Sequence, residues 1–188
     1  MSMKFSEGKA VGKFRLKDGR EVIARLPRKG DEKKLLEYIN SLIGEKVYIL
    51  ESKKKTPKEE KEYLKKLLDG MKKGNRIDII LECGGKIISV IGTEKSESGK
   101  KDSHVCSIAL GIVKEYRGLG IGNKLMEMLI DMSKNKMKCR ITRLSVYEPN
   151  KVAISLYRKH KFREVGRIPN GINHYGKFID EIIMVKEL

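Results

Sequence analysis

The residues that could do chemistry in this sequence gather in a glycine-rich turn. The turn follows an apolar run over residues 105–113 and reads Arg117-Gly118-Leu119-Gly120-Ile121-Gly122. Apolar residues then recur at helical spacing over residues 125–132, so the pattern predicts a strand, a tight turn and the start of a helix. The unpaired backbone N–H groups and the dipole of a helix start attract anions, and glycine lets a bulky anion come close. The ligand that would fit such a turn is a phosphate or pyrophosphate.

The turn alone does not identify its ligand. Its spacing differs from the Gly-x-Gly-x-x-Gly fingerprint of dinucleotide-binding proteins, and no Gly-x-x-x-x-Gly-Lys-Ser/Thr loop is present. A glycine-rich turn before a helix is more often only a turn. The neighbouring elements are needed to distinguish a phosphate-binding turn from a purely structural one.

The elements that follow the turn complete a β-α-β unit. Residues 139–147 read as a strand, and Glu148-Pro149-Asn150 then starts a helix that is apolar on one side. Residues 162–168 read as a strand, Pro169 opens a loop, and residues 178–185 read as the last strand. The strands on either side of the helix that starts at the turn should be parallel, with a right-handed crossover.

Two hairpins and two helices are expected before the turn. Residues 11–16 and 21–26 flank an Asp-Gly turn, and residues 77–82 and 86–93 flank a Gly-Gly turn. Asp31 should cap a first helix that Gly44 closes. Thr56 should cap a second that runs to about Met71, with Gly74 after it. Residues 47–50 read as a short extended segment or as part of the connection between the helices, and residues 94–103 as a polar surface loop.

Together these elements predict a single α/β (α+β) domain over residues 1–188, with residues 1–10 as a loose N-terminal segment. The length suits one domain. We expect a mixed, mostly antiparallel twisted sheet with a central parallel β-α-β unit and helices on both faces.

The composition favours a cytoplasmic protein whose many lysines mostly form a solvated surface. A net charge of +17 argues for nucleic acid, an anionic cofactor or an acidic surface, although interleaved acidic residues favour a solvated, lysine-rich surface. Cys83, Cys106 and Cys139 form no Cys-x-x-Cys pair, so we expect core residues in a reducing compartment, with neither a metal site nor a disulfide framework. No apolar run could span a membrane and no signal peptide opens the chain.

With the helix after residue 150 included, residues 105–188 resemble the GCN5-related N-acetyltransferase superfamily, and the upstream residues do so more weakly. That family carries Gln/Arg-x-x-Gly-x-Gly/Ala at the turn, which here is the sequence from Arg117 to Gly122. It then carries Asn-x-x-Ala-x-x-Leu-Tyr, which here begins at Asn150 and ends at Tyr157. The tail over residues 176–184 is similar to the family's last strand. Two specific motifs in the right order make the resemblance strong.

The resemblance implies acetyl-CoA as the co-substrate. Its pyrophosphate would bind the N–H groups of the turn, where Arg117 could add charge, and its pantetheine arm would pair with the edge of the strand before the turn. In the family this strand carries a bulge, which Gly111 would ease. The residues expected at the co-substrate are Leu110, Gly111, Ile112, Arg117, Gly118, Leu119, Gly120, Ile121, Gly122, Asn150 and Tyr157.

The resemblance also implies catalytic roles. Tyr157 would protonate the departing CoA sulfur as the general acid. Some relatives place the base five residues before the motif asparagine, but that position is Ser145 here, which is a poor base. Glu148, Glu82 or a water chain stand as alternatives. Lys161 also replaces a glycine of the family at a helix end, where a left-handed conformation costs about 1 kcal/mol.

The expected reaction is direct attack of a neutral primary amine on the thioester in a ternary complex. An α-amine has a pKa of about 8 and a lysine amine one of about 10.4, so the α-amine is easier to neutralise where no strong base is evident. We therefore expect a peptide or protein N-terminus, an amino acid or another small amine as acceptor. The net positive charge disfavours polycationic acceptors unless a local acidic cleft overrides it.

Two other classes compete with this interpretation. A basic nucleic-acid-binding module would use the charge, but only 6% of residues are aromatic and no motif interleaves them with basic residues, so we do not expect nucleic acid as a partner. A non-catalytic acetyl-CoA sensor on the same fold is the other alternative. We expect no membrane partner, and an exposed edge strand in the last hairpin would allow a homodimer.

Overall fold

The computed structural model describes residues 6–96 and 100–188. Its strands are β1 (Ala10–Arg15), β2 (Glu21–Arg25), β3 (Arg76–Cys83), β4 (Lys86–Lys95), β5 (Val105–Ile112), β6 (Ile141–Tyr147), β7 (Arg163–His174) and β8 (Lys177–Glu187). Its helices are α1 (Glu32–Gly44), α2 (Pro57–Lys73), α3 (Ile121–Asp131) and α4 (Lys151–Lys159), with a 3-10 turn η1 (Lys114–Tyr116) and a π-helical segment η2 (Met132–Lys136).

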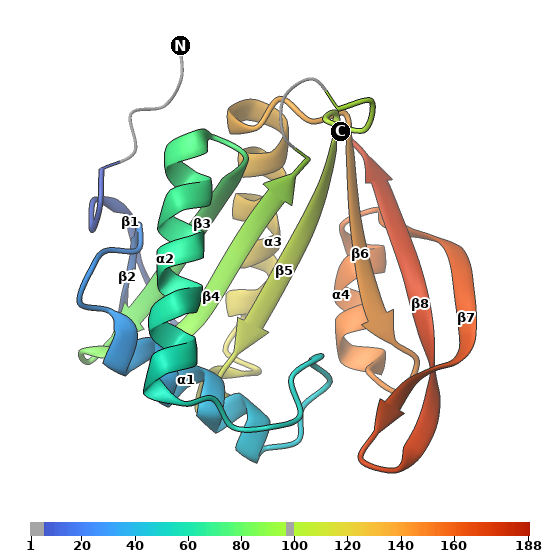
Figure 1. Ribbon diagram of the computed structural model, residues 1–188, viewed down its shortest axis with the longest axis horizontal. Coiled ribbons are helices and arrows are strands. Elements are labelled where there is room, and N and C mark those ends of the chain that lie inside the picture. Colours follow the sequence, from blue (N-terminus) through green and yellow to red (C-terminus); the bar gives the residue numbers. More distant parts are fainter. Residues whose placement is uncertain (1–5, 97–99) are drawn as a thin grey trace.

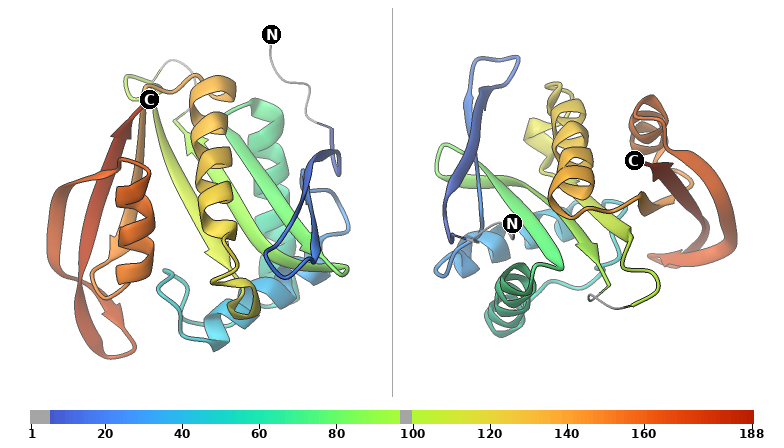
Figure 2. Two further views of the ribbon diagram at one scale, coloured as in Figure 1. Left: turned by 180° about the vertical axis from the view of Figure 1, so that it is seen from behind. Right: turned by 90° about the horizontal axis from the view of Figure 1, so that it is seen from above.

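The strands form one sheet in the order β1-β2-β3-β4-β5-β6-β8-β7 (Figure 1). All neighbours in this sheet are antiparallel except β5 and β6, which are parallel. Helices α1 and α2 cover one face, and α3 and α4 cover the other (Figure 2). The expected mixed sheet is therefore confirmed. Strand β7 lies at one edge, and its pairing with a second copy stays a prediction.

Local sequence accounts for both ends of α2. The Thr56 hydroxyl accepts a hydrogen bond from the Glu59 N–H, and the Glu59 carboxylate accepts one from the Thr56 N–H. Pro57 occupies the first helical position, where an N–H would have no partner within the helix. Gly74 ends the helix with a φ of +76°. The expected cap and stop are both confirmed.

Other segments depart from the expectation. β7 continues through Pro169 to His174, because an edge strand tolerates a residue without an N–H, and a register shift against β8 absorbs the irregular backbone. Residues 47–50 belong to the connection between α1 and α2, with bends at residues 48–50, which is the second of the two expected alternatives. Asp31 precedes α1 without capping it, because its carboxylate binds the Arg25 guanidinium at 2.7 and 2.8 Å.

Both expected irregular segments extend beyond the described residues. Of the N-terminal segment expected to be loose, residues 6–9 include a turn and Ala10 already begins β1, whereas residues 1–5 lie outside the described part. Strand β4 continues to Lys95, which shortens the expected surface loop, and residues 97–99 of that loop are also outside the described part. No helix in the described ranges is long and apolar enough to cross a membrane.

Cys106 and Cys139 form a disulfide, so the expectation that the chain lacks disulfides is wrong. Their Cα atoms are 6.1 Å apart, because the parallel pairing of β5 with β6 brings together two strand starts that are 33 residues apart in the sequence. Only the crossover through α3 creates this proximity, so the cysteine spacing could not reveal it. Cys83 is free and buried.

Strands β5 and β6 pair only at their starts. Residues 105–107 lie in parallel register with residues 141–143, after which the two strands diverge (Figure 1). On its other side, β5 keeps pairing with β4 as far as Ile112. Among the described strands, none therefore pairs with the β6 side of β5 beyond Ser107, and polar backbone groups there are left for another partner.

Candidate functional site

At each of the three glycines of the turn, the backbone conformation or the packing disfavours a side chain. Gly118 and Gly120 have φ values of +75° and +80°, a region that other residues enter at a cost, and Gly120 is the residue that precedes α3. Gly122 has an ordinary φ, but a Cβ atom there would lie 3.2 Å from a methyl group of Leu156 on α4. The first backbone N–H groups of α3 have no partner within the helix, so the turn presents anion-binding donors.

This turn lies at a cavity of about 700 Å³ between the diverging strands β5 and β6, which we call the wedge cavity. The residues expected at the co-substrate line it, except Gly111 and Leu119. It also contains residues that no motif pointed to, namely Lys17, Tyr48, Tyr147 and Glu181. The structure thus brings together β5, the start of α3, β6 and α4, as the two motifs predicted.

Tyr157 lies on the buried side of α4 and lines the wedge cavity. Burial raises the pKa of Tyr157 to about 12, so its hydroxyl stays protonated at neutral pH. Within the described part of the chain, no hydrogen bond engages this hydroxyl. A protonated, unpaired hydroxyl at a cavity wall can donate to a ligand there.

Asn150 begins α4 and lines the same cavity. Its side-chain oxygen accepts a hydrogen bond from the Ala153 N–H at 3.3 Å, which caps the helix. The side-chain amide N–H groups remain as donors for a ligand. One residue can therefore both start the helix and contact the co-substrate.

Arg117 is already engaged by the protein. Its Nε donates to the Ile112 carbonyl at 2.8 Å, and its guanidinium lies 2.7 Å from the Glu45 carboxylate just after α1. Glu45 thus neutralises the charge that we expected Arg117 to supply. Lys17, on the turn between β1 and β2, is a better source, since its Cε lies 3.1 Å from the position of a Cβ on Gly120. Within residues 6–96 and 100–188, no ion pair involves Lys17.

The two carboxylates expected as weak candidates for the base lie outside the lining of the wedge cavity. Glu82 is paired with Arg25 and Lys34, and its hydrogen bond from Arg25 lowers its pKa to about 2, which makes it a poor base. Glu148 forms an ion pair with the nearby Lys151 at the start of α4. Ser145 and Glu181 do line the cavity. Geometry and charge therefore argue against Glu82.

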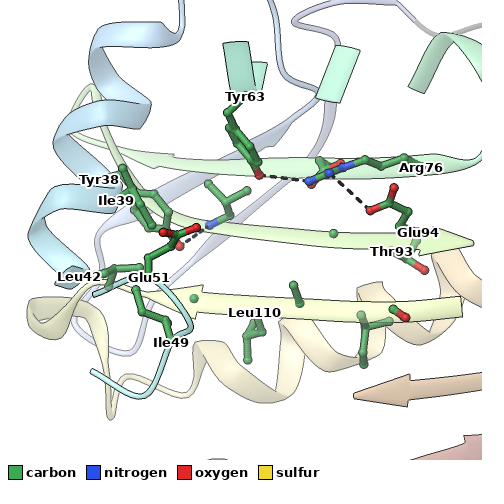
Figure 3. Close-up of a pocket in the computed structure, with 17 residues that line it drawn as sticks. Tyr38, Ile39, Leu42, Ile49, Glu51, Tyr63, Arg76, Thr93, Glu94 and Leu110 are labelled. Carbon is green, nitrogen blue, oxygen red and sulfur yellow. Dashed lines mark hydrogen bonds and ion pairs between the residues drawn. The ribbon is translucent and has the colours of Figure 1, made fainter. Parts of the chain in front are cut away.

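A second cavity, of about 290 Å³, lies on the other side of β5 beneath α1 and α2, and we call it the helix-side cavity. Figure 3 shows Tyr38, Ile39 and Leu42 entering from α1, Tyr63 from α2, and Ile49 and Glu51 from the connection between them. The two cavities share a set of lining residues, namely Ile49, Ile108, Ala109 and Leu110. Strand β5 is therefore accessible from both faces of the sheet.

Gly111 belongs to the helix-side cavity. The register between β4 and β5 is unbroken from Cys106 to Ile112, so the bulge expected at Gly111 is absent from this pairing. A Cβ atom on Gly111 would instead collide with the Tyr38 hydroxyl, which accepts a hydrogen bond from the Val90 N–H at 3.3 Å. Gly111 thus makes room for a buried tyrosine at the centre of the sheet.

Comparison with known proteins agrees with this geometry. The family model described as the acetyltransferase (GNAT) family matches residues 44–162. A Bacillus subtilis relative, a spermine/spermidine N(1)-acetyltransferase, is 35% identical over 77 residues, which is 41% of this chain. The match spans only 45% of the length of that relative.

Solved structures extend the likeness to nearly the whole fold. A GNAT family acetyltransferase from Streptococcus pneumoniae has a TM-score of 0.77 and 26% identity, over 89% of this chain and 99% of its own. The Salmonella typhimurium protein yncA, in a complex with its cofactor acetyl-CoA, has a TM-score of 0.76 over 89% of this chain and 94% of its own. At 17% identity, the latter supports the fold alone.

Proposed function

The chain belongs to the GNAT acetyltransferase family, and we propose that it is an acetyl-CoA-dependent N-acetyltransferase that acts on a primary amine. One observation carries the proposal. The wedge cavity joins an anion-binding turn, a strand side without a neighbouring strand and a protonated tyrosine, and it meets the helix-side cavity at β5. Such an arrangement lets an extended acyl carrier and an acceptor approach one point from opposite faces of the sheet.

The wedge cavity supplies complementary groups along the length of acetyl-CoA. The backbone N–H groups from Gly118 to Gly122 and the Lys17 ammonium would face the pyrophosphate. The free side of β5 at Leu110 and Ile112 would pair with the pantetheine amides as an added strand does. Asn150 would donate its amide N–H to the same arm.

The proposed reaction is one displacement at the thioester carbonyl. The amine nitrogen attacks the carbonyl carbon, backbone N–H groups of β5 stabilise the oxyanion, and the C–S bond breaks as the C–N bond forms. Tyr157 gives its proton to the departing thiolate. The amine loses its own proton to Glu148, to Glu181 or to a water chain, and solvent restores the Tyr157 hydroxyl.

The acceptor would enter through the helix-side cavity. A peptide or protein N-terminus, an amino acid or another small amine remains a candidate, because these amines are the easiest to deprotonate. The spermine/spermidine acetyltransferase among the relatives adds polyamines to this set. Although the net charge of +17 disfavours polycations, a local acidic cleft would reverse that effect.

The test is release of free thiol from acetyl-CoA over a panel of peptides, amino acids, polyamines and amino sugars. We expect at least one amine to give turnover that stops when acetyl-CoA is replaced by CoA. Acetyl-CoA binding without turnover on the whole panel would instead support a non-catalytic sensor. Steeply salt-dependent binding to RNA or DNA, with no effect of acetyl-CoA, would support a nucleic-acid-binding module.

A further inference from the structure

The carboxylate of Glu60 is buried without a partner. Glu60 lies in the first turn of α2, on the helix face that continues through the buried Leu64 and Leu67, and only 5% of its surface is exposed. Over the described ranges, no hydrogen bond or ion pair engages this carboxylate, and the nearby charge of Lys55, which does act on it, is already paired with Glu51. Burial raises the pKa of Glu60 to about 7. A buried charge without a direct partner is costly in a folded protein, and such a group at a cavity is a candidate for contact with a ligand.

Glu60 faces a cavity of about 420 Å³ between α1 and α2, which we call the α2 cavity. The lining of this cavity includes four carboxylates, Glu51, Glu59, Glu60 and Glu62, against the two ammonium groups of Lys55 and Lys66. Lys55 is itself paired with Glu51 at 2.5 Å. The cavity is therefore locally acidic in a chain whose net charge is +17.

The α2 cavity adjoins the helix-side cavity. The two share Tyr38, Ile39, Glu51, Tyr63 and Val90 in their linings, and the helix-side cavity reaches β5 at residues 107–111. The two adjoining cavities thus place Glu60, two tyrosine rings and the strand where the acetyl group would lie along one side of the sheet. Rings and aliphatic side chains suit a methylene chain. The ring of Tyr63 already faces a cation, since the Arg76 guanidinium lies 5.5 Å from its centroid.

We propose that Glu60 binds a second ammonium group of the acceptor, which makes the enzyme selective for diamines and polyamines over monoamines. This inference rests on the proposed function, since Glu60 would bind the end of the acceptor that does not react with the thioester. The ammonium would give this carboxylate a direct counterion, which Lys55 does not supply because Lys55 is paired with Glu51, and hydrogen bonds between charged groups are strong.

The test is binding of spermidine to the full chain in saturating CoA, measured by titration calorimetry, with butylamine as the monoamine. We expect spermidine to bind at least about tenfold more tightly than butylamine, which corresponds to about 1.4 kcal/mol. The Glu60→Gln variant, which keeps the size of the side chain, should lose that advantage and leave butylamine and acetyl-CoA binding unchanged. Asp69→Asn, an exposed position on α2, should change nothing.

Equal binding of spermidine by wild type and Glu60→Gln would overturn the proposal, as would equal binding of spermidine and butylamine by wild type. Should Glu60→Gln fail to fold, Glu60→Asp tests the same point, because it retains the charge on a shorter side chain. We expect Glu60→Asp to weaken spermidine binding severalfold without affecting butylamine, and unchanged spermidine binding would count against the site.

Thiol release separates this proposal from the proposed function. If no amine is acetylated but spermidine binding depends on Glu60, the proposed function fails and the cation site stands. If monoamines and polyamines are acetylated equally, and Glu60→Gln changes neither rate, the cation site fails and the proposed function stands.

Discussion

Tyr157 offers the sharpest test at the scale of a single residue. If its hydroxyl protonates the thiolate, Tyr157→Phe should lower kcat by about 10²-fold or more and leave the affinity for acetyl-CoA unchanged, because the ring still fills its place in α4. Steady-state thiol release and calorimetric binding of acetyl-CoA measure the two effects. Tyr175→Phe removes a hydroxyl outside the wedge cavity and should not alter kcat. Unchanged turnover in Tyr157→Phe would remove Tyr157 from the mechanism.

Glu60 also predicts a dependence of stability on pH. Its ordinary pKa is 4.5 and its pKa in the folded chain is about 7, so the folded state binds more protons between these values. The contribution of Glu60 to the unfolding free energy therefore falls as pH rises from about 4.5 to about 7 and then stays low. The advantage of Glu60→Gln over wild type in thermal unfolding should grow across that window, whereas Asp69→Asn should show no such trend. A constant difference would mean that Glu60 ionises normally.

Sequence motifs identified some of the residues that we propose for the site and could not identify others. Asn150 and Tyr157 were predictable because both lie in one short motif with a fixed spacing. Lys17 and Glu60 could not be predicted. Lys17 lies about a hundred residues before the glycine turn that it contacts. In the sequence, Glu60 cannot be distinguished from the many glutamates at the surface, although it is buried in the structure. Glu60 is noticed only because it is buried, and its burial depends on how α2 packs over the sheet.

At the scale of an element, the end of α4 carries a strain that can be measured. Lys161 adopts a φ of +68°, the left-handed conformation in which the family's glycine would be free of strain. Lys161→Gly removes that strain but adds freedom to the unfolded chain, so we expect a net gain of about 0.5–1 kcal/mol in chemical denaturation. Ser155→Gly, at an exposed position in the middle of α4, should instead cost about 0.5 kcal/mol. A loss in both variants would show that the Lys161 side chain contributes more than its backbone costs.

Elements were predictable where one local interaction determines them. Thr56, Pro57 and Gly74 delimit α2 through contacts within a few residues of each other, and the helix has those limits in the structure. The prediction that Pro169 opens a loop was wrong. A proline is tolerated in a strand that lies at the edge of a sheet, and the position of β7 at the edge follows only from the complete sheet. Gly111 was expected to ease a bulge, yet the side chain that needs its space, Tyr38, comes from a helix more than seventy residues earlier.

At the scale of the whole molecule, β5 and β6 are paired at one end of the wedge cavity and separated at the other. Pairing between β5 and β6 covers three residues on each strand, and the Cys106–Cys139 disulfide lies at that paired end. At the separated end, the ring of Tyr48 in the connection between α1 and α2 contacts Tyr147 at the end of β6 and His174 at the end of β7. The paired end therefore fixes the angle at which β5 and β6 diverge.

The disulfide should therefore increase the free energy of unfolding, mainly by restricting the unfolded chain. It closes a loop of about 33 residues that contains the glycine turn and α3, and a loop of that length contributes about 3–4 kcal/mol by restricting the unfolded chain. Dithiothreitol should lower the unfolding midpoint of wild type accordingly and have no effect on a Cys106→Ala/Cys139→Ala double variant. Cys83→Ala should keep the sensitivity of wild type, because Cys83 takes no part in the bond. Three alkylatable thiols in the unreduced, unfolded chain would contradict the disulfide, whereas one thiol, appearing as three after reduction, is the expected count.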